Sequence, residues 1–188
     1  VIASMQFKID VSKPTILVIG GSLGALSINN AIANNIQLIM NLGINLIWQT
    51  GAMFKIRSEE CLLGINSDRV SVHTFIEEMD HAYAVSDIII SRAGAIAISE
   101  LCCIGKPVIL IPSPNVSENH QYKNAQSLVN KNAALLVEDS NANSKLVYTL
   151  KDLLNNEDLM VSLGSNIKKI AVTNAADKIA KIALGLVK

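Results

Sequence analysis

The sequence TILVIGGSLGA, at residues 15–25, decides the fold because it passes from a strand through a glycine turn into a helix. Residues 15–19 are apolar or β-branched, as in a strand that is buried on both faces. Gly20, Gly21 and Gly24 then permit a tight turn, and apolar residues at helical spacing begin at Ala25. A strand followed directly by a helix is the repeating unit of a parallel α/β sheet.

The same unit recurs along the chain. We predict strands at residues 15–19, 44–49, 70–74, 87–90, 107–111 and 134–137. We predict helices at residues 25–42, 54–63, 77–85, 95–104 and 119–130, and then at 144–154, 157–170 and 175–186. Strands joined by helical crossovers predict an α/β fold with a Rossmann-like, doubly wound, parallel six-stranded sheet.

The composition restricts the class of protein. Sixteen basic and sixteen acidic residues cancel, so no global field favours nucleic acid, and we expect none as a partner. The three cysteines and three histidines lack metal-ligand spacing, so we expect a reducing, cytoplasmic location, no metal site and no cofactor. We expect one domain at residues 11–188, with residues 1–10 as a linker or leftover.

Two glycine-containing turns are candidates for a binding site, because ligands bind beyond the carboxyl ends of parallel strands. The turn GGSLGA could hold a phosphate with its amides, although a plain strand-to-helix turn explains it equally well. In SRAGAIAISE, at residues 91–100, Gly94 opens a helix whose first amides suit a phosphate. Glu100, further along that helix, suits two vicinal ribose hydroxyls; the alternative is a solvated glutamate on an apolar helix.

Two well-known nucleotide motifs are disfavoured. A Walker loop needs a lysine after its glycines, and the glycine turn here has none. A dinucleotide fold needs an acidic residue at the end of the second strand, which ends in Trp48, Gln49 and Thr50. The loop at residues 112–121 ends with His120 and Gln121, which could bind sugar hydroxyls or only cap the following helix.

Four motifs in order, GGSLGA, FIEEM, SRAGAIAISELCCIGKPVILIP and ENHQYKNA, closely resemble a known family. This family is the MurG-type N-acetylglucosaminyltransferases of bacteria, and the resemblance covers their carboxyl-terminal domain from Thr15 to the end of the chain. It implies the carboxyl-terminal, donor-binding half of a GT-B glycosyltransferase, a fold with two facing Rossmann-like halves. The amino-terminal acceptor domain would be absent from this chain.

The resemblance also implies which residues contact the substrate. The expected diphosphate contacts are Gly21, Ser22, Gly24, Ala95, Ile96 and Ala97. The expected uracil contacts are the backbone of Ile76 with Phe75 and Met79 beside it, the ribose contact is Glu100, and the sugar contacts are His120 and Gln121. Arg92 and Gly94 in the intervening turn complete the set. Many relatives have glutamine in place of His120 and threonine in place of Ala97, so uridine diphosphate binding is better supported than the choice of sugar.

The implied activity is the transfer of N-acetylglucosamine from UDP-N-acetylglucosamine to lipid I, which makes lipid II for peptidoglycan. The implied partners are this donor, a lipid-linked acceptor, and the amino-terminal acceptor domain, which would supply the missing catalytic residues. The full enzyme would be peripheral on the cytoplasmic face of the inner membrane, and this chain alone would bind the donor but transfer little. The alternatives are a non-catalytic UDP-sugar-binding subunit of a split transferase and a sugar-nucleotide epimerase.

Overall fold

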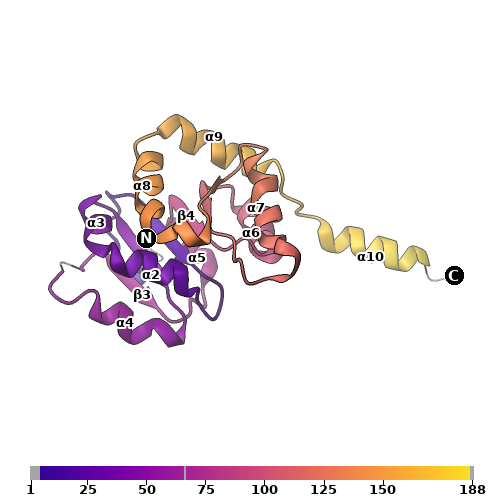
Figure 1. The fold of residues 1–188 in the computed structure, drawn as a ribbon. Helices are drawn as coiled ribbons and strands as arrows, with labels where there is room; N and C mark the ends of the chain where they lie inside the picture. Colours follow the sequence, from indigo (N-terminus) through magenta and orange to yellow (C-terminus); the bar gives the residue numbers. More distant parts are fainter. Residues whose placement is uncertain (1–4, 66, 187–188) are drawn as a thin grey trace.

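A computed structural model describes residues 5–65 and 67–186 and has one six-stranded parallel sheet (Figure 1). The strands are β1 (Thr15–Ile19), β2 (Asn45–Gln49), β3 (Val70–His73), β4 (Ile88–Ser91), β5 (Val108–Leu110) and β6 (Leu135–Leu136). Their order across the sheet is β3-β2-β1-β4-β5-β6, and every neighbouring pair is parallel. The prediction of a Rossmann-like, doubly wound, six-stranded sheet is confirmed.

Helices cover both faces of the sheet because alternate residues of each strand point to opposite faces. Ile16 and Val18 of β1 belong to one core, and Leu17 and Ile19 belong to the other. The first core includes residues of α2 (Leu26–Asn34), α3 (Ile36–Asn41) and α8 (Ala142–Leu154). The second includes residues of α5 (Met79–Val85), α6 (Ala95–Ile104) and α7 (His120–Val129). Two-sided burial explains why the strands contain almost continuous apolar runs.

The predicted single helix at residues 25–42 is wrong, because α2 and α3 are separated at Asn35. The backbone of Asn35 leaves the helical region, with φ −115° and ψ 15°. Its side-chain amide donates to Ala31 O at 2.8 Å and to Asn143 O, at the start of α8, at 3.0 Å. An asparagine side chain that bonds to nearby carbonyls competes with helical bonding, which accounts for the break.

Other helix boundaries differ from prediction by a few residues. The 3-10 turn η2 (Ser117–Asn119) precedes α7, and Glu118 and Asn119 have φ of 54° and 53°, so the α-helix begins only at His120. The helix predicted at residues 54–63 is η1 (Ala52–Phe54) followed by a shorter α4 (Lys55–Glu60). The turn η3 (Asp139–Asn141) leads into α8, and α9 (Glu157–Lys168) follows α8.

The segment before Val11 contributes to the domain, although the sequence suggests little structure there. Phe7 is 1% exposed and lies in the second core, with its ring edge-on to His73 at 5.3 Å between ring centroids. The backbone of Asp10 also donates to the buried side chain of Asn45 at 3.0 Å. Phe7 and Asp10 therefore attach this segment to the domain, whereas residues 1–4 of the predicted linker lie outside the described residues.

The final helix, α10 (Ala175–Leu186), projects away from the rest of the chain (Figure 1). It has no buried residue, and Ile179, Ile182 and Leu186 are exposed large hydrophobic side chains. The helix therefore leaves an apolar face uncovered and does not pack on the sheet. Within the described part of the chain, none of the helices has the length and apolar character needed to cross a bilayer.

Candidate functional site

The loops after β1, β3 and β4 meet at the carboxyl edge of the sheet and enclose a cavity of about 670 Å³, here called the Glu100 cavity. Eleven predicted site residues line it: Gly21, Ser22, Phe75, Ile76, Met79, Arg92, Gly94, Ile96, Ala97, Glu100 and Gln121. Gly24, Ala95 and His120 do not. Residues that are distant in sequence thus converge because the ends of parallel strands share one edge.

The amino-terminal end of α6 provides hydrogen-bond donors at this cavity. Gly94 is its N-cap residue, no side chain caps the helix, and its first turn has no acidic residue. The first helical bond runs from Ile98 N to Gly94 O at 2.9 Å, so the amides of residues 95–97 precede the helical ladder. Free amides at the positive end of a helix dipole suit an anion, and Gly94, Ile96 and Ala97 all line the cavity.

Gly24 has a packing role that the sequence does not reveal. Its φ is 77°, and a Cβ atom there would lie 2.0 Å from the carbonyl oxygen of Thr50. Glycine is therefore required for the close approach of the β1 loop to the end of β2. Gly24 lines a second, neighbouring cavity instead of the Glu100 cavity.

Glu100 of α6 is exposed and lines the cavity together with Tyr83 of α5. The Tyr83 hydroxyl donates to Glu100 Oε2 at 3.3 Å, and both residues line the cavity. Burial, followed by the nearby Glu100 carboxylate, raises the pKa of the Tyr83 hydroxyl, so Tyr83 remains a donor at neutral pH. Tyr83 thus holds one oxygen of an exposed carboxylate, which can still accept hydrogen bonds from a pair of hydroxyls.

Gln49 at the end of β2 connects two of the loops and was not predicted as a site residue. Its side chain is nearly fully buried, with 2% of the residue exposed, and lines the Glu100 cavity. Its Nε2 donates to Gly21 O at 3.0 Å, and its Oε1 accepts from Ile76 N at 2.9 Å. The amide of Ile76, expected to contact uracil, therefore already has a partner within the chain. The only feature of the sequence that could have indicated this role of Gln49 was an amide side chain at the end of an apolar strand.

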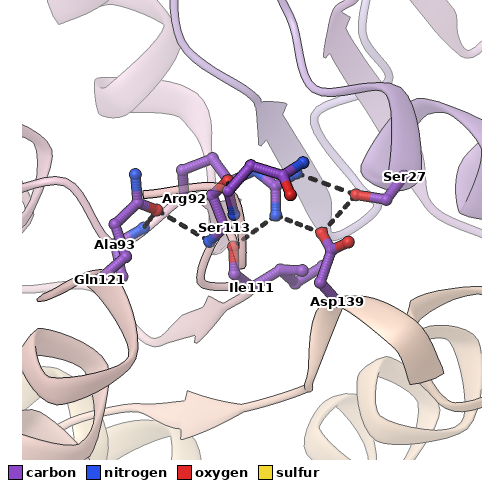
Figure 2. A network of polar contacts seen from close by, with 8 residues as sticks. Ser27, Arg92, Ala93, Ile111, Ser113, Gln121 and Asp139 are labelled. Carbon is purple, nitrogen blue, oxygen red and sulfur yellow. Dashed lines mark hydrogen bonds and ion pairs between the residues drawn. The ribbon is translucent and has the colours of Figure 1, made fainter. Parts of the chain in front are cut away.

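Arg92 joins the ends of four elements (Figure 2). Its guanidinium donates to Asp139 Oδ1 at 2.5 Å, to Ile111 O at 3.0 Å and to Ser27 Oγ at 2.9 Å. Ser27 also donates to Asp139 Oδ1. The ion pair is largely buried, since the Arg92 and Asp139 side chains are 16% and 20% exposed. The charge of Arg92 is thus compensated within the protein, which reduces its capacity to attract a phosphate.

The two predicted sugar contacts differ in position. Gln121 lines both cavities, and its Oε1 accepts from Ser113 N at 3.0 Å and Ala93 N at 3.3 Å (Figure 2). These bonds fix the side chain and leave its amide nitrogen as a donor. His120 is exposed, its Nδ1 lies 2.9 Å from Ser117 O, and it lines neither cavity.

The Glu100 cavity therefore offers amide donors for an anion, a carboxylate for a diol, and apolar surface from Phe75, Ile76 and Met79 for a planar ring. None of the histidines lines it, so the described residues offer no imidazole base there. Among the described residues, no cluster of three or more histidine, cysteine or acidic side chains could hold a metal ion. This arrangement is suited to binding a nucleoside diphosphate.

Comparison with known proteins agrees with this chemistry. Residues 15–181 match the model of the family described as "Glycosyltransferase family 28 C-terminal domain". The chain is 43% identical, over 96% of its length, to a protein of Flavobacterium psychrophilum named "UDP-N-acetylglucosamine--N-acetylmuramyl-(pentapeptide) pyrophosphoryl-undecaprenol N-acetylglucosamine transferase". The match covers 48% of that protein, so the chain spans about half the length of the curated relatives it matches.

Two solved structures share the fold. The crystal structure of MurG from Acinetobacter baumannii superposes with a TM-score of 0.81 at 25% identity, covering 97% of this chain and 53% of that one. A UDP-GlcNAc 2-epimerase from Neisseria meningitidis, solved with UDP-GlcNAc bound, gives a TM-score of 0.69 at 15% identity, covering 97% of this chain and 48% of that one. The epimerase shows a common fold only, whereas the family match covers most of this sequence. The chain belongs to the glycosyltransferase family 28 C-terminal domain family.

Proposed function

We propose that this chain is the donor-binding half of a GT-B transferase that moves N-acetylglucosamine from UDP-N-acetylglucosamine to lipid I, which makes lipid II for peptidoglycan. The observation that carries the proposal is the Glu100 cavity, where helix amides, a carboxylate and an apolar wall meet in a single site. The name of the Flavobacterium psychrophilum relative supplies the substrate class.

In the proposed complex the nucleotide lies across the carboxyl edge of the sheet. Uracil packs against Phe75, Ile76 and Met79, and the ribose hydroxyls donate to Glu100. The diphosphate accepts hydrogen bonds from Ser22 and from the amides at the start of α6. During inverting transfer, negative charge grows on the departing uridine diphosphate, and preorganised amides with a helix dipole stabilise that charge. This stabilisation of the leaving group is the catalytic contribution of this chain.

The remaining parts of the reaction are assigned to a further, amino-terminal half. That half would hold the lipid-linked acceptor and the base that activates its hydroxyl, and would place the enzyme on the cytoplasmic face of the inner membrane. The uncovered apolar face of α10, with Ile179, Ile182 and Leu186, supports packing against another domain. On this basis the isolated chain binds the donor and transfers little or no sugar.

Nucleotide selectivity tests the proposal. We expect isothermal titration calorimetry to show binding of uridine diphosphate to the chain at least about tenfold tighter than binding of adenosine diphosphate. The reason is that the apolar wall of Phe75, Ile76 and Met79 is proposed to fit a single-ring base, and a size mismatch in an apolar pocket costs about 1–3 kcal/mol. Equal affinities would remove the uracil assignment of the loop after β3, and failure of both nucleotides to bind would overturn the proposed function.

Removal of residues 174–188 tests whether α10 serves a partner instead of this domain. We expect the thermal midpoint and the uridine diphosphate affinity to stay unchanged, with a stability change within about 0.5 kcal/mol, because α10 buries no side chain. Circular dichroism melts and calorimetry provide the two measurements. A large drop in the thermal midpoint would mean that α10 stabilises this domain in solution, contrary to the packing role proposed for it.

A further inference from the structure

The segment before β1 reaches the edge of the sheet at which the Glu100 cavity lies. Asp10 lies at the start of β2, because its backbone carbonyl and amide bond to the side chain of Asn45 at 2.8 and 3.0 Å. Phe7 lies at the other end, because its ring is edge-on to His73, the last residue of β3. His73 pairs with Gln49, the last residue of β2. The segment therefore extends from the amino edge of the sheet to its carboxyl edge.

Gln6, at this carboxyl edge, uses both ends of its side-chain amide to hold the start of α5. Its Nε2 donates to Glu78 Oε2 at 2.7 Å, and its Oε1 lies 2.7 Å from His81 Nδ1. Glu78 is the N-cap residue of α5 and does not cap the helix with its own side chain. The helix has only seven residues, and so short a helix depends on contacts from outside itself. Gln6 supplies two such contacts.

The start of α5 is also part of the candidate site. Met79, its first residue, lines the Glu100 cavity. Tyr83, one turn further along, lines it too and donates to Glu100 Oε2 at 3.3 Å. Neither Gln6 nor its two partners lines the cavity. A shift of the start of α5 would therefore change the wall of the site, although Gln6 itself does not face it.

We propose that Gln6 is a positioning residue for nucleotide binding, which holds the start of α5 and, through it, Met79 and Tyr83 in the arrangement that receives the uridine. This inference depends on the proposed function, which places the nucleoside diphosphate in the Glu100 cavity. Coupling of this kind is reciprocal, so a nucleotide that contacts α5 also stabilises the contacts of Gln6. The segment before β1 is thus coupled to the nucleotide site and is more than a linker.

A pair of glutamine variants tests the positioning role. Calorimetry should measure uridine diphosphate binding to the unmodified chain, to Gln6→Ala and to Gln37→Ala. We expect Gln6→Ala to weaken binding by about 3- to 10-fold, the effect of losing modest hydrogen bonds. Gln37 is the matched control, because it is also exposed, donates only to Asn41 at 3.2 Å, and does not line the cavity. Its replacement should change the affinity by less than about twofold, and an equally small effect of Gln6→Ala would overturn the inference.

Exchanging the two partners separates positioning from general damage to the segment. Gln6→Glu places a like charge against Glu78 and should weaken uridine diphosphate binding at least as much as Gln6→Ala. Adding Glu78→Gln restores a donor and an acceptor in reversed order, because the amide introduced at position 78 can donate to the carboxylate introduced at position 6. We expect the double variant to bind within about twofold of the unmodified chain. A double variant as weak as Gln6→Glu would contradict the positioning role.

Hydrogen exchange measures the reciprocal effect without any activity assay. We expect saturating uridine diphosphate to slow exchange of the backbone amides in residues 5–10 by at least about threefold in the unmodified chain, and not in Gln6→Ala. Exchange that nucleotide leaves unchanged in the unmodified chain would overturn the inference while the proposed function stands. If the unmodified chain binds no uridine diphosphate, the proposed function fails and the inference fails with it. A thermal melt of each variant verifies that the protein is folded.

Discussion

Replacing Glu100 by alanine is expected to weaken uridine diphosphate binding by about 5- to 150-fold, corresponding to about 1–3 kcal/mol. Glu100 lines the cavity, and the Tyr83 hydroxyl donates to one of its carboxylate oxygens at 3.3 Å. Hydrogen bonds from ribose hydroxyls to an ionised, oriented acceptor are stronger than those to a neutral one. Calorimetry on the folded variant measures the loss of affinity. An unchanged affinity would mean that Glu100 is a solvated surface residue that does not contact the nucleotide.

A ligand that lacks the ribose hydroxyls shows whether Glu100 acts through them. With 2′,3′-dideoxyuridine diphosphate, the unmodified protein and the Glu100→Ala variant should bind with similar affinity, because the partner groups are absent. A double-mutant cycle between residue and ligand then gives the coupling energy directly. Glu157→Ala on α9 is the control for loss of one negative charge, since Glu157 is exposed and lies outside the cavity. Equal losses for both ligands would exclude the ribose assignment.

Most of the fold follows from local sequence signals. The apolar runs of β1 and β4 and the glycine turns after them are strong, local features, and they fix the strand and helix order. Asn35 shows where such reasoning stops, because its break of the first helix involves the carbonyl of Asn143, more than a hundred residues away. A contact of this kind depends on the packing of α8 against α2, which helical periodicity does not report.

Some residues of the candidate site could likewise be predicted from the local sequence, and others could not. Glu100 and the start of α6 were predictable because one motif contains both the helix start and the carboxylate on a single helix. Gln49 was not, since its role depends on hydrogen bonds to atoms of two distant loops. Gly24 was predicted as a turn glycine, and its φ of 77° agrees with that, but its close approach to Thr50 O depends on how the ends of two strands lie side by side.

Gln49 is expected to have the second large effect, because its buried side chain joins two loops that line the Glu100 cavity. Replacing it by methionine, which has a similar size, leaves Gly21 O and Ile76 N without their partner. We expect a loss of about 1–3 kcal/mol in the free energy of unfolding, the usual cost of unpaired buried polar groups. We also expect a loss of at least about tenfold in uridine diphosphate affinity, because the loop that faces the base is no longer fixed.

A matched variant separates positioning from general destabilisation. Asn45 lies at the other end of β2, is fully buried, and donates to Asp10 O and Lys13 O at 2.8 and 3.1 Å. Asn45→Ala should lower stability by a similar amount while the ratio of uridine to adenosine diphosphate affinities stays unchanged. Gln49→Met should reduce that ratio, because Gln49 holds Ile76, which is proposed to face the base. If both variants keep the ratio, Gln49 supports only the fold.

The variant Gln49→Glu can still accept a hydrogen bond from Ile76 N. If it restores most of the selectivity, the acceptor atom of Gln49, and not its bond to Gly21, positions the loop after β3.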